Sequence, residues 1–195
     1  MRIFHGLKIR IQPPMKVRFV IMDTDNIFHN TSREPQLKAI FLDRDGVINH
    51  DPGDYTRNLS EFTILPTVMK SLKVLKDRGF VFVLITNQGG IAKGIYGHEE
   101  VLEIHDYLQK MCEDNGTPIL DIYYSPHHET TGLSLTRKPG SMMVERAVAR
   151  YNIDPKKSWM VGDKQRDLDS AAALGVPGVL IAPNDALEDY LDKLI

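Results

Sequence analysis

The sequence predicts a three-layer α/β fold with a central, mostly parallel sheet, and two patterns support this fold class. From Leu37 onward, short apolar runs alternate with segments whose apolar residues recur at helical spacing. The run FVFVLIT at 80–86 is apolar throughout, as expected for a strand that helices cover on both faces. Strands that alternate with helices are joined by right-handed crossovers, and such crossovers build a parallel sheet.

The elements can be assigned in order along the chain. The predicted strands are the apolar runs at 38–43, 80–86, 120–125, 158–163 and 177–182. The predicted helices lie at 66–79, 98–116, 141–152, 167–175 and 185–195. The first helix begins at Pro66 and ends at Gly79, two residues that favour these positions in helices. This alternation predicts one domain over 37–195.

Residues 1–36 precede the pattern and are predicted to be an N-terminal extension. Within them, VIMDTDNIF at 20–28 is similar to IFLDRDGVI at 40–48, because each is an apolar run that contains Asp-x-Asp. The segment between the two runs is too short for a crossover helix, so they are not successive parallel strands. Only the second run is followed, at a spacing that fits a loop, a helix and a strand, by the next strand end at Thr86. Asp23 is therefore not predicted to be catalytic. The extension is either loosely packed or disordered, or it adds a strand to a sheet edge of this chain or of a partner.

Composition limits the partners and the compartment. The 195 residues are 42% hydrophobic and 26% charged, as in ordinary soluble domains, and a net charge of −2 offers no basic surface for nucleic acid. No run approaches the roughly 20 apolar residues of a membrane span, and the N-terminus lacks the apolar core of a signal peptide. Cys112 is the only cysteine, which favours a reducing compartment. We expect a cytoplasmic monomer or small homo-oligomer that binds a small molecule, and neither nucleic acid nor membrane.

Residues that can carry chemistry follow the predicted strands. In a parallel α/β sheet, the ligand site lies beyond the carboxyl ends of the strands. The residues found there are Asp43 and Asp45, Thr86 and Asn87, Arg137 and Lys138, and Asp163 and Asp167. The segment 137–139 is predicted to open the helix after the third strand. Acids, a hydroxyl and a cation at one sheet edge are the groups needed to move a phosphoryl group with a divalent metal.

Each residue type suits that chemistry. A phosphomonoester is a dianion, so its charge must be neutralised before a nucleophile approaches. Mg²⁺ prefers carboxylate oxygens, which Asp43 and Asp163 on neighbouring strands can supply, while Lys138 and the Thr86 hydroxyl remain for the phosphoryl oxygens. A carboxylate can be the nucleophile, and a second acid two residues away can protonate the leaving oxygen and then deprotonate water. Gly46 lets the chain turn sharply after the pair of acids.

Each motif also has a simpler interpretation. Asp-x-Asp-Gly is more often a turn, Thr-Asn and Gly-Asp after a strand often cap a helix, and Arg-Lys-Pro is often a solvated loop. All four motifs in order, each near a predicted strand end, favour catalysis. The alternative from another class is a phosphate-binding module that has lost catalysis. Asp45 argues against it, because a binding module needs no general acid.

The same residues resemble the haloacid dehalogenase-like (HAD-like) phosphohydrolases. DRDGVIN at 43–49 is similar to their first motif, TN at 86–87 to the second, RKP at 137–139 to the third and GDKQRD at 162–167 to the fourth. The resemblance covers most of the chain, from Leu37 to about Pro183. It implies a Rossmannoid three-layer phosphatase that uses Mg²⁺.

The resemblance implies a role for each matching residue. Asp43 would be the nucleophile and Asp45 the general acid and base, while Thr86 and Lys138 would bind the transferring phosphoryl group. Mg²⁺ would bind the Asp43 carboxylate, the Asp45 backbone carbonyl and Asp163. The implied supporting residues are Gly46, Lys164 and Asp167, the last of which would contact the water of the metal or Lys138.

The longer strings FLDRDGVIN, TNQGGIAKG, YYSPHH, RKP and MVGDK resemble one branch, that of heptose bisphosphate and histidinol-phosphate phosphatases. The resemblance implies that residues after the first motif grip the substrate and that Arg137 touches its distal part. The implied substrate-binding residues are Asp51, Gly53, Asp54, Asn87, Gln88 and Arg137. The substrate stays open between a heptose bisphosphate, histidinol phosphate and another small phosphate. The intervals 46–65 and 126–136 are too short for a cap domain, so we expect a capless member.

One feature of that branch is missing. The branch carries a zinc loop with Cys-x-His and then Cys-x-Cys before Arg-Lys-Pro, and these positions here hold Ser125, His127, Ser134 and Thr136. A zinc site needs about four ligands, mostly thiolate or imidazole, so His127 and His128 cannot form one alone. We therefore expect Mg²⁺ and no zinc.

Overall fold

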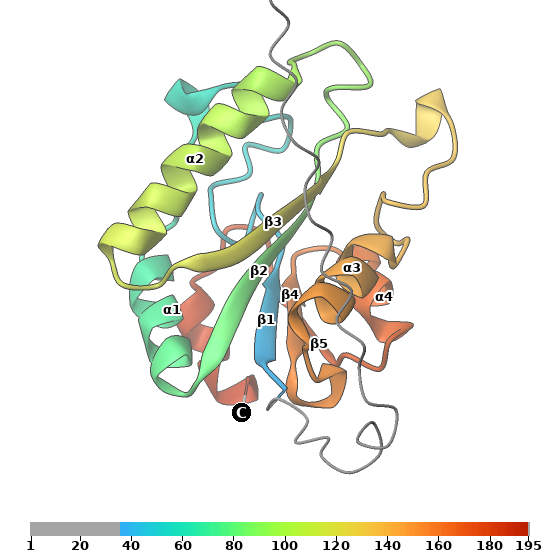
Figure 1. Ribbon diagram of the computed structural model, residues 1–195. Helices are drawn as coiled ribbons and strands as arrows, with labels where there is room; N and C mark the ends of the chain where they lie inside the picture. Colours follow the sequence, from blue (N-terminus) through green and yellow to red (C-terminus); the bar gives the residue numbers. More distant parts are fainter. Residues whose placement is uncertain (1–35, 195) are drawn as a thin grey trace, which may run out of the picture. The chain divides into compact units, whose positions relative to one another are not determined.

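The computed structural model describes residues 36–194, which form a parallel five-stranded sheet between two groups of helices (Figure 1). The strands are β1 (Lys38–Leu42), β2 (Phe80–Asn87), β3 (Ile119–Ser125), β4 (Trp159–Gly162) and β5 (Gly178–Leu180). The α-helices are α1 (Val68–Asp77), α2 (His98–Asp114), α3 (Met142–Tyr151) and α4 (Gln165–Ala172). The predicted α/β fold class is confirmed. Residues 1–35 lie outside the described part of the chain, so both interpretations of the N-terminal extension stay predictions.

Two apolar cores, one on each face of the sheet, hold the helices in place. Successive side chains of a strand point to opposite faces. Ile40 and Leu42 of β1 pack in the core that α1 and α2 cover, whereas Ala39 and Phe41 pack in the core that α3 and α4 cover (Figure 1). All four side chains are at most 1% exposed. Burial on both faces explains why the strand runs of the sequence are apolar throughout.

The strand order places the site. The sheet has the order β3-β2-β1-β4-β5, and every neighbouring pair is parallel. The chain therefore moves outward from β1 to β3 and then returns to the other side of β1 for β4 and β5. In such sheets a crevice forms beyond the carboxyl ends of the strands at this reversal. Here the reversal lies at β1, with β2 and β4 as its neighbours.

Two elements differ from the sequence-based prediction. The segment 137–139 does not open a helix, because the chain first makes a tight turn at Gly140 and α3 begins at Met142. The closing helix predicted over 185–195 is a 3-10 helix, η5 (Leu187–Lys193). Short helical pieces often adopt this tighter geometry, because few residues remain to form α-helical hydrogen bonds.

The site has no cap domain among the described residues. Between the end of β1 and α1, the only helical element is η2 (Leu59–Glu61), a 3-10 helix. Between β3 and α3, the only one is η3 (Glu129–Thr131), also a 3-10 helix. The carboxyl ends of the strands are therefore covered by loops alone.

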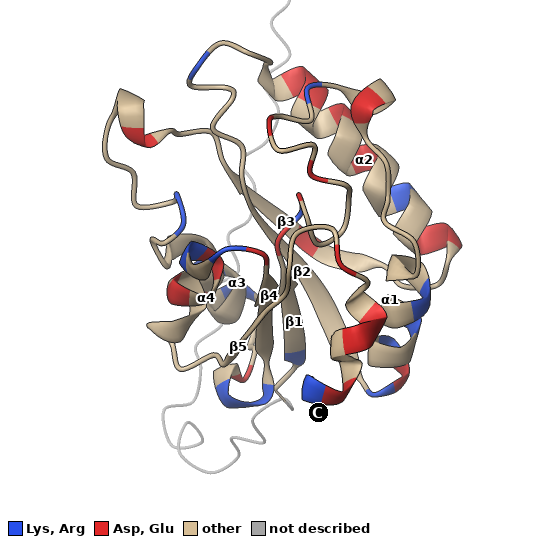
Figure 2. Ribbon diagram, turned by 180° about the vertical axis from the view of Figure 1, so that it is seen from behind, with Lys and Arg blue, Asp and Glu red and all other residues tan. Residues whose placement is uncertain are grey.

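The helices carry charges of both signs on their exposed surfaces. Figure 2 shows acidic and basic residues together on α1 and α2. Over residues 36–194, we find no helix that is long and apolar enough to cross a bilayer.

Candidate active site

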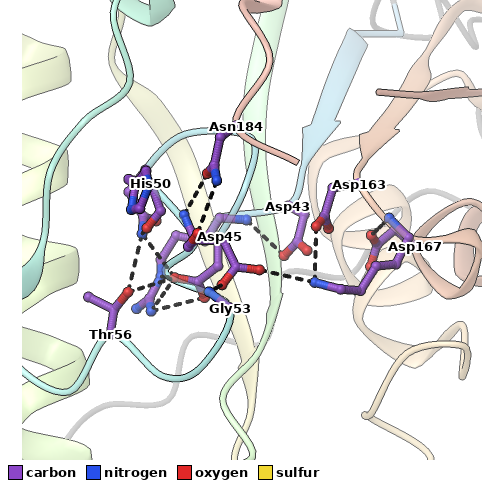
Figure 3. Close-up of polar contacts among 12 residues, drawn as sticks. Asp43, Asp45, His50, Gly53, Thr56, Asp163, Asp167 and Asn184 are labelled. Atoms are coloured by element: carbon purple, nitrogen blue, oxygen red, sulfur yellow. Dashed lines mark hydrogen bonds and ion pairs between the residues drawn. The ribbon is translucent and has the colours of Figure 1, made fainter. Parts of the chain in front are cut away.

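Three buried carboxylates meet at the ends of β1 and β4. Asp43 follows β1, Asp163 follows β4, and Asp167 lies in the first turn of α4. One oxygen from each lies within 4.8 Å of the others, and no residue of the three is more than 8% exposed. In Figure 3, Asp43 lies between Asp45 on one side and Asp163 and Asp167 on the other. Burial raises the pKa of Asp43 to about 7 and also raises the pKa of Asp163, because it removes water from the charged forms.

Glycines allow these acids to approach one another. Gly46 has a φ of +83°, and a Cβ at this position would lie 2.8 Å from Oδ2 of Asp163. A Cβ on Gly162 would overlap the side chain of Asp167. A left-handed turn and two close contacts thus explain the glycines of the first and fourth motifs.

A buried lysine joins two of the acids. Lys138 is 1% exposed, and its Nζ lies 2.8 Å from Oδ1 of Asp43 and 2.8 Å from Oδ1 of Asp167. The same Nζ donates to the carbonyl of Ile85 in β2 at 2.7 Å. The ammonium is therefore fixed beside the Asp43 carboxylate, where it can neutralise an anion that approaches Asp43.

The acid cluster of Asp43, Asp163 and Asp167 fits a divalent cation. Three carboxylates exceed the single charge of Lys138, and Mg²⁺ prefers carboxylate oxygens. Oδ1 of Asp163 is buried and has no hydrogen-bond partner among the described residues, which is costly unless a ligand satisfies it. Lys164 contacts the other oxygen, Oδ2, at 3.0 Å from a side chain that is 42% exposed. Asp43 and Asp163 are thus suited to hold Mg²⁺.

Asp45 is held by a set of hydrogen-bond donors. Its carboxylate accepts from the Arg44 guanidinium at 2.9 and 3.0 Å and from Asn49 at 3.0 Å, with a longer hydroxyl contact to Thr56 at 3.4 Å. Burial opposes the charged form, but the Arg44 charge and these hydrogen bonds hold the pKa of Asp45 below its usual range. The Asp45 side chain is still 26% exposed, so it can be reached from the cavity described below.

Gln88 is buried between two of the predicted catalytic residues. Its Nε2 lies 3.1 Å from Oδ2 of Asp45 and 2.9 Å from Oγ1 of Thr86. Its Oε1 accepts from the Tyr96 hydroxyl at 2.9 Å. Gln88 and Thr86 are each 1% exposed. Both polar atoms of its amide are thus engaged within the protein, and the prediction that Gln88 binds substrate stays a prediction.

A cavity opens beside Asp45. It is lined by Arg44, Asp45, Asp51, Asp54, Tyr55, Thr56, Asn87, Tyr96, Lys164 and Arg166. Of the predicted substrate-binding residues, Asp51, Asp54 and Asn87 belong to this lining, whereas Gly53, Gln88 and Arg137 do not. The lining combines basic, acidic and aromatic side chains, which suits a small polar substrate more than an apolar one.

The loop after β1 is fixed by residues from distant parts of the chain. The Asp51 N–H donates to the side chain of Asn184 at 2.6 Å, and its carbonyl accepts from Asn184 at 3.0 Å (Figure 3). Nζ of Lys164 lies 3.3 Å from Oδ2 of Asp51. Gly53, with a φ of +82°, donates its N–H to Asp51 at 2.9 Å. These contacts join the loops after β1, β4 and β5.

The side chains of Asn87 and Arg137 both hydrogen-bond to backbone groups. Oδ1 of Asn87 accepts from the Lys138 N–H at 3.0 Å, and its Nδ2 donates to the Lys138 carbonyl at 3.1 Å. Arg137 donates to the carbonyl of His127 at 3.0 Å and reaches Glu129 at 3.5 Å. The end of β2 therefore fixes the peptide that carries the buried lysine.

Hydroxyl side chains occupy the positions that correspond to the zinc-binding cysteines of the heptose bisphosphate and histidinol-phosphate phosphatase branch. Oγ1 of Thr136 lies 3.0 Å from Oγ of Ser125 and 2.9 Å from Oγ of Ser134. His128, in the same loop, bonds to the hydroxyl of Thr130 at 2.9 Å. The three hydroxyls thus tie the two ends of the loop together by hydrogen bonds.

Several residues of the site were not predicted from the sequence. These are Arg44, Asn49, Thr56, Tyr96, Arg166 and Asn184. Asn184 follows β5, so the rule that ligand sites lie after strands could have found it. Tyr96 lies in a loop with no motif, and only the folded chain places its hydroxyl on Gln88.

An acidic pair after β1, a hydroxyl at the end of β2, a buried lysine and an acid after β4, on a parallel sheet, define a phosphohydrolase of the HAD-like class. A HAD-hydrolase-like family model matches residues 135–193. The chain is 40% identical over 145 residues to D-glycero-beta-D-manno-heptose-1,7-bisphosphate 7-phosphatase of Haemophilus ducreyi. This match covers 71% of the chain and 79% of the relative. The chain is 35% identical over 148 residues to D-glycero-alpha-D-manno-heptose-1,7-bisphosphate 7-phosphatase of Photorhabdus laumondii, or 73% of this chain and 80% of that one.

A solved structure agrees with both relatives. The D,D-heptose 1,7-bisphosphate phosphatase of B. bronchiseptica, complexed with magnesium and phosphate, superposes with a TM-score of 0.69 at 30% identity. The match covers 80% of this chain and 87% of that one. The chain therefore belongs to the heptose-1,7-bisphosphate phosphatase family of HAD-like hydrolases.

Proposed function

We propose that this phosphatase removes the 7-phosphate of D-glycero-D-manno-heptose 1,7-bisphosphate with Mg²⁺, through an aspartyl-phosphate on Asp43. The observation that carries the proposal is the buried Asp43 carboxylate, 2.8 Å from Lys138 and next to the acids after β4. The names of the relatives support the choice of substrate. Relatives named for both anomers match, so the anomer is left to experiment.

The residues divide the hydrolysis into two displacements. In the first, a carboxylate oxygen of Asp43 attacks phosphorus and the bond from phosphorus to the sugar oxygen breaks. Asp45 gives that oxygen a proton, because the phosphate dianion beside it raises its pKa and favours its protonated form once the substrate is bound. In the second, Asp45 takes a proton from water while the water oxygen attacks phosphorus. The bond to Asp43 then breaks, which releases inorganic phosphate and restores both acids. Asp45 lies two residues from Asp43 and borders the cavity, as this exchange requires.

Side chains that are already held in place neutralise the negative charge of the phosphoryl group. Lys138 is held in place by Asp43, Asp167 and Ile85, so its ammonium needs little rearrangement when an anion arrives. Thr86 contributes a hydroxyl at the end of β2. Mg²⁺ on Asp43, Asp163 and the Asp45 carbonyl would neutralise further phosphoryl charge.

The cavity beside Asp45 fits a small polar substrate, whose sugar would lie between the loops that line the cavity. Asp51, Tyr55 and Lys164 offer an acceptor, an aromatic face and a cation to a sugar hydroxyl or a second phosphate. Because no cap domain is present among the described residues, these loops have to provide the selectivity.

A substrate panel tests the proposal. Both anomers of the heptose bisphosphate, histidinol phosphate and common sugar monophosphates are incubated with the protein and Mg²⁺, and phosphate release is measured. We expect the highest kcat/KM on a heptose bisphosphate, with one equivalent of phosphate released. Asp43→Asn, nearly isosteric, should lower turnover by at least about 10³-fold, as loss of a nucleophile does.

Three outcomes would contradict parts of the proposal. Faster turnover of histidinol phosphate would change the substrate, and an active Asp43→Asn variant would exclude the aspartyl-phosphate. Binding of the phosphates without release would indicate the catalytically silent module.

Compartment, assembly and metal content are further parts of the proposal. We propose a cytoplasmic monomer or small homo-oligomer that contains no zinc. The single cysteine, Cys112, is buried in α2, and hydroxyls stand at Ser125, Ser134 and Thr136. Light scattering gives the assembly, and metal analysis of the purified protein would contradict the last point if it found stoichiometric zinc.

A further inference from the structure

The amide of Gln88 contacts two catalytic groups at once. Its Nε2 donates to Oδ2 of Asp45 at 3.1 Å and to Oγ1 of Thr86 at 2.9 Å. Among residues 36–194, no other side chain hydrogen-bonds to both. We infer that Gln88, oriented by Tyr96, is a positioning residue. It fixes the orientation of the general acid, Asp45, and of the phosphate-binding hydroxyl of Thr86. The inference rests on the proposed function and adds two residues to it.

Tyr96 determines which way the amide faces. An amide has two protons on nitrogen and only acceptor sites on oxygen, whereas the Asp45 carboxylate can only accept. The Tyr96 hydroxyl lies 2.9 Å from Oε1 and donates to it, so the nitrogen must face Asp45 and Thr86. The reverse orientation would place the amide oxygen against the Asp45 carboxylate. Tyr96 thus excludes an orientation that would repel the general acid.

The orientation has a consequence for Thr86. A hydroxyl has one proton to donate and two lone pairs that accept. Because Thr86 accepts from Gln88, its own proton stays available for a phosphoryl oxygen. Without Gln88, the buried Thr86 hydroxyl would be free to rotate. Gln88 therefore sets the hydroxyl as a donor before the substrate arrives, which is how preorganised sites stabilise charge.

The backbone is built to bring Tyr96 back to Gln88. The Gln88 N–H donates to the carbonyl of Ser125 in β3 at 2.7 Å, which fixes the residue at the end of β2. The loop then returns, with the Ile95 N–H donating to the Gly90 carbonyl at 2.9 Å. A Cβ on Gly90 would overlap the Tyr96 ring. Gly90 is therefore the residue that lets the phenol reach the amide.

Three variants test the inference on the full-length protein. Gln88→Ala removes the amide, Gln88→Glu keeps its shape but replaces the donor by an acceptor, and Tyr96→Phe removes only the hydroxyl. We expect kcat to fall by about 10-fold or more in the two Gln88 variants and several-fold in Tyr96→Phe, because positioned acids contribute about 10²–10⁴-fold. KM should change little, since both polar atoms of the Gln88 amide are engaged within the protein. Gln109→Ala and Tyr107→Phe, both on α2, are the matched controls, and we expect them to be as active as the wild type.

The leaving group provides a readout that a purely structural role would not change. kcat/KM reports the first displacement, in which a sugar oxygen needs a proton from Asp45, whereas p-nitrophenolate needs little protonation. We expect Gln88→Ala to lose more kcat/KM on the sugar phosphate than on p-nitrophenyl phosphate. Thermal unfolding midpoints of all variants show whether each is folded.

Two results would overturn the inference. One is a raised KM at unchanged kcat, which would make Gln88 a substrate contact. The other is a folded Gln88→Glu variant with wild-type kcat, which would mean that the donor is unimportant. A wild-type protein that cleaves another phosphomonoester, but not the heptose bisphosphate, would overturn the proposed substrate instead. The same variants are then compared on the phosphomonoester that is cleaved.

Discussion

Lys138 shows how a single residue determines the electrostatics of the site. Its ammonium lies between Asp43 and Asp167, and the side chains of all three are at most 8% exposed. An isolated charge is strongly disfavoured in such a place, so each of these groups depends on the others. The same lysine that can bind a phosphoryl group therefore also stabilises the arrangement of the two carboxylates.

Lys138→Met tests this dependence. Methionine keeps the length of the side chain but leaves two buried carboxylates without their cation, and removal of one partner of a buried pair costs about 3–5 kcal/mol. We expect the free energy of unfolding, measured in urea at pH 7.5, to fall by this amount, together with the phosphatase activity. Lys164→Met removes a 42% exposed partner of Asp163, so it should cost about 1 kcal/mol or less. Equal stability losses in the two variants would contradict the argument.

The acids and the lysine of the site could be predicted from the sequence, whereas most of their partners could not. Asp43, Asp163 and Thr86 follow apolar runs, and the rule for parallel sheets places such residues at one edge. Gln88 was assigned to the site, but its contacts with Asp45, Thr86 and Tyr96 were not predicted. Its partners depend on where the loop that ends at Tyr96 returns, and no local pattern encodes that path.

At the scale of elements, the turn after β1 connects backbone conformation to chemistry. Gly46 adopts a left-handed conformation, and its N–H donates to the Asn49 carbonyl at 2.8 Å. Its carbonyl accepts from Asn184 at 2.9 Å. The strands themselves were predictable, because burial on both faces demands apolar runs. The start of α3 and the 3-10 form of η5 were not, because turn geometry and short helices depend on tertiary contacts.

Gly46→Ala tests two requirements at this turn, the left-handed backbone and the close approach of Asp163. A left-handed alanine costs roughly 1 kcal/mol, and its Cβ would also press on Oδ2 of Asp163. Gly175→Ala is the matched control, since Gly175 has a φ of +76° and nothing lies within 4 Å of its Cβ position. We expect both variants to lose stability in urea, Gly46→Ala by more because of its added contact with Asp163, and only Gly46→Ala to lose Mg²⁺-dependent phosphatase activity. An active Gly46→Ala variant would show that Asp163 tolerates displacement.

Helix α2 carries a buried histidine that makes stability depend on pH. Burial, with the Arg44 charge adding to it, lowers the pKa of His105 to about 3, and Nε2 of His105 has no hydrogen-bond partner among the described residues. An unfolded histidine has a pKa of about 6.5, so below that pH the unfolded chain binds a proton that the folded chain does not. The stabilisation is complete above about pH 6.5 and is lost as pH falls toward 3.

His105→Gln tests this linkage. Between pH 7.5 and 5, we expect the wild type to lose about 2 kcal/mol of unfolding free energy through His105, and the variant to lose correspondingly less. His98→Gln, an exposed position at the start of the same helix, should keep the pH dependence of the wild type. Urea unfolding at the two pH values measures it. Parallel curves for the wild type and His105→Gln would contradict a neutral buried histidine.

At the scale of the molecule, one sheet supports both the cores and the site. Among the described residues, 36–194, the two cores and the candidate site draw on both ends of the range, from Ala39 in β1 to Leu194. The sheet begins next to Leu37, whose N–H donates to the Asn152 carbonyl at 3.1 Å and whose carbonyl accepts from Asp154 at 2.8 Å. We therefore expect residues 37–195 to suffice for catalysis.

Deletion of residues 1–36 tests whether the N-terminal extension contributes. The second Asp-x-Asp run, at 40–48, supplies Asp43 and Asp45, so loss of the similar run at 20–28 removes no residue of the proposed mechanism. We expect kcat/KM on the heptose bisphosphate and the urea midpoint of the shortened protein to match those of the full-length chain. Light scattering on both proteins compares their assembly. A fall in activity or a change in oligomeric state would favour the other interpretation of the extension, in which the run VRFVIMD at 17–23 adds a strand to a sheet edge of this chain or of a partner.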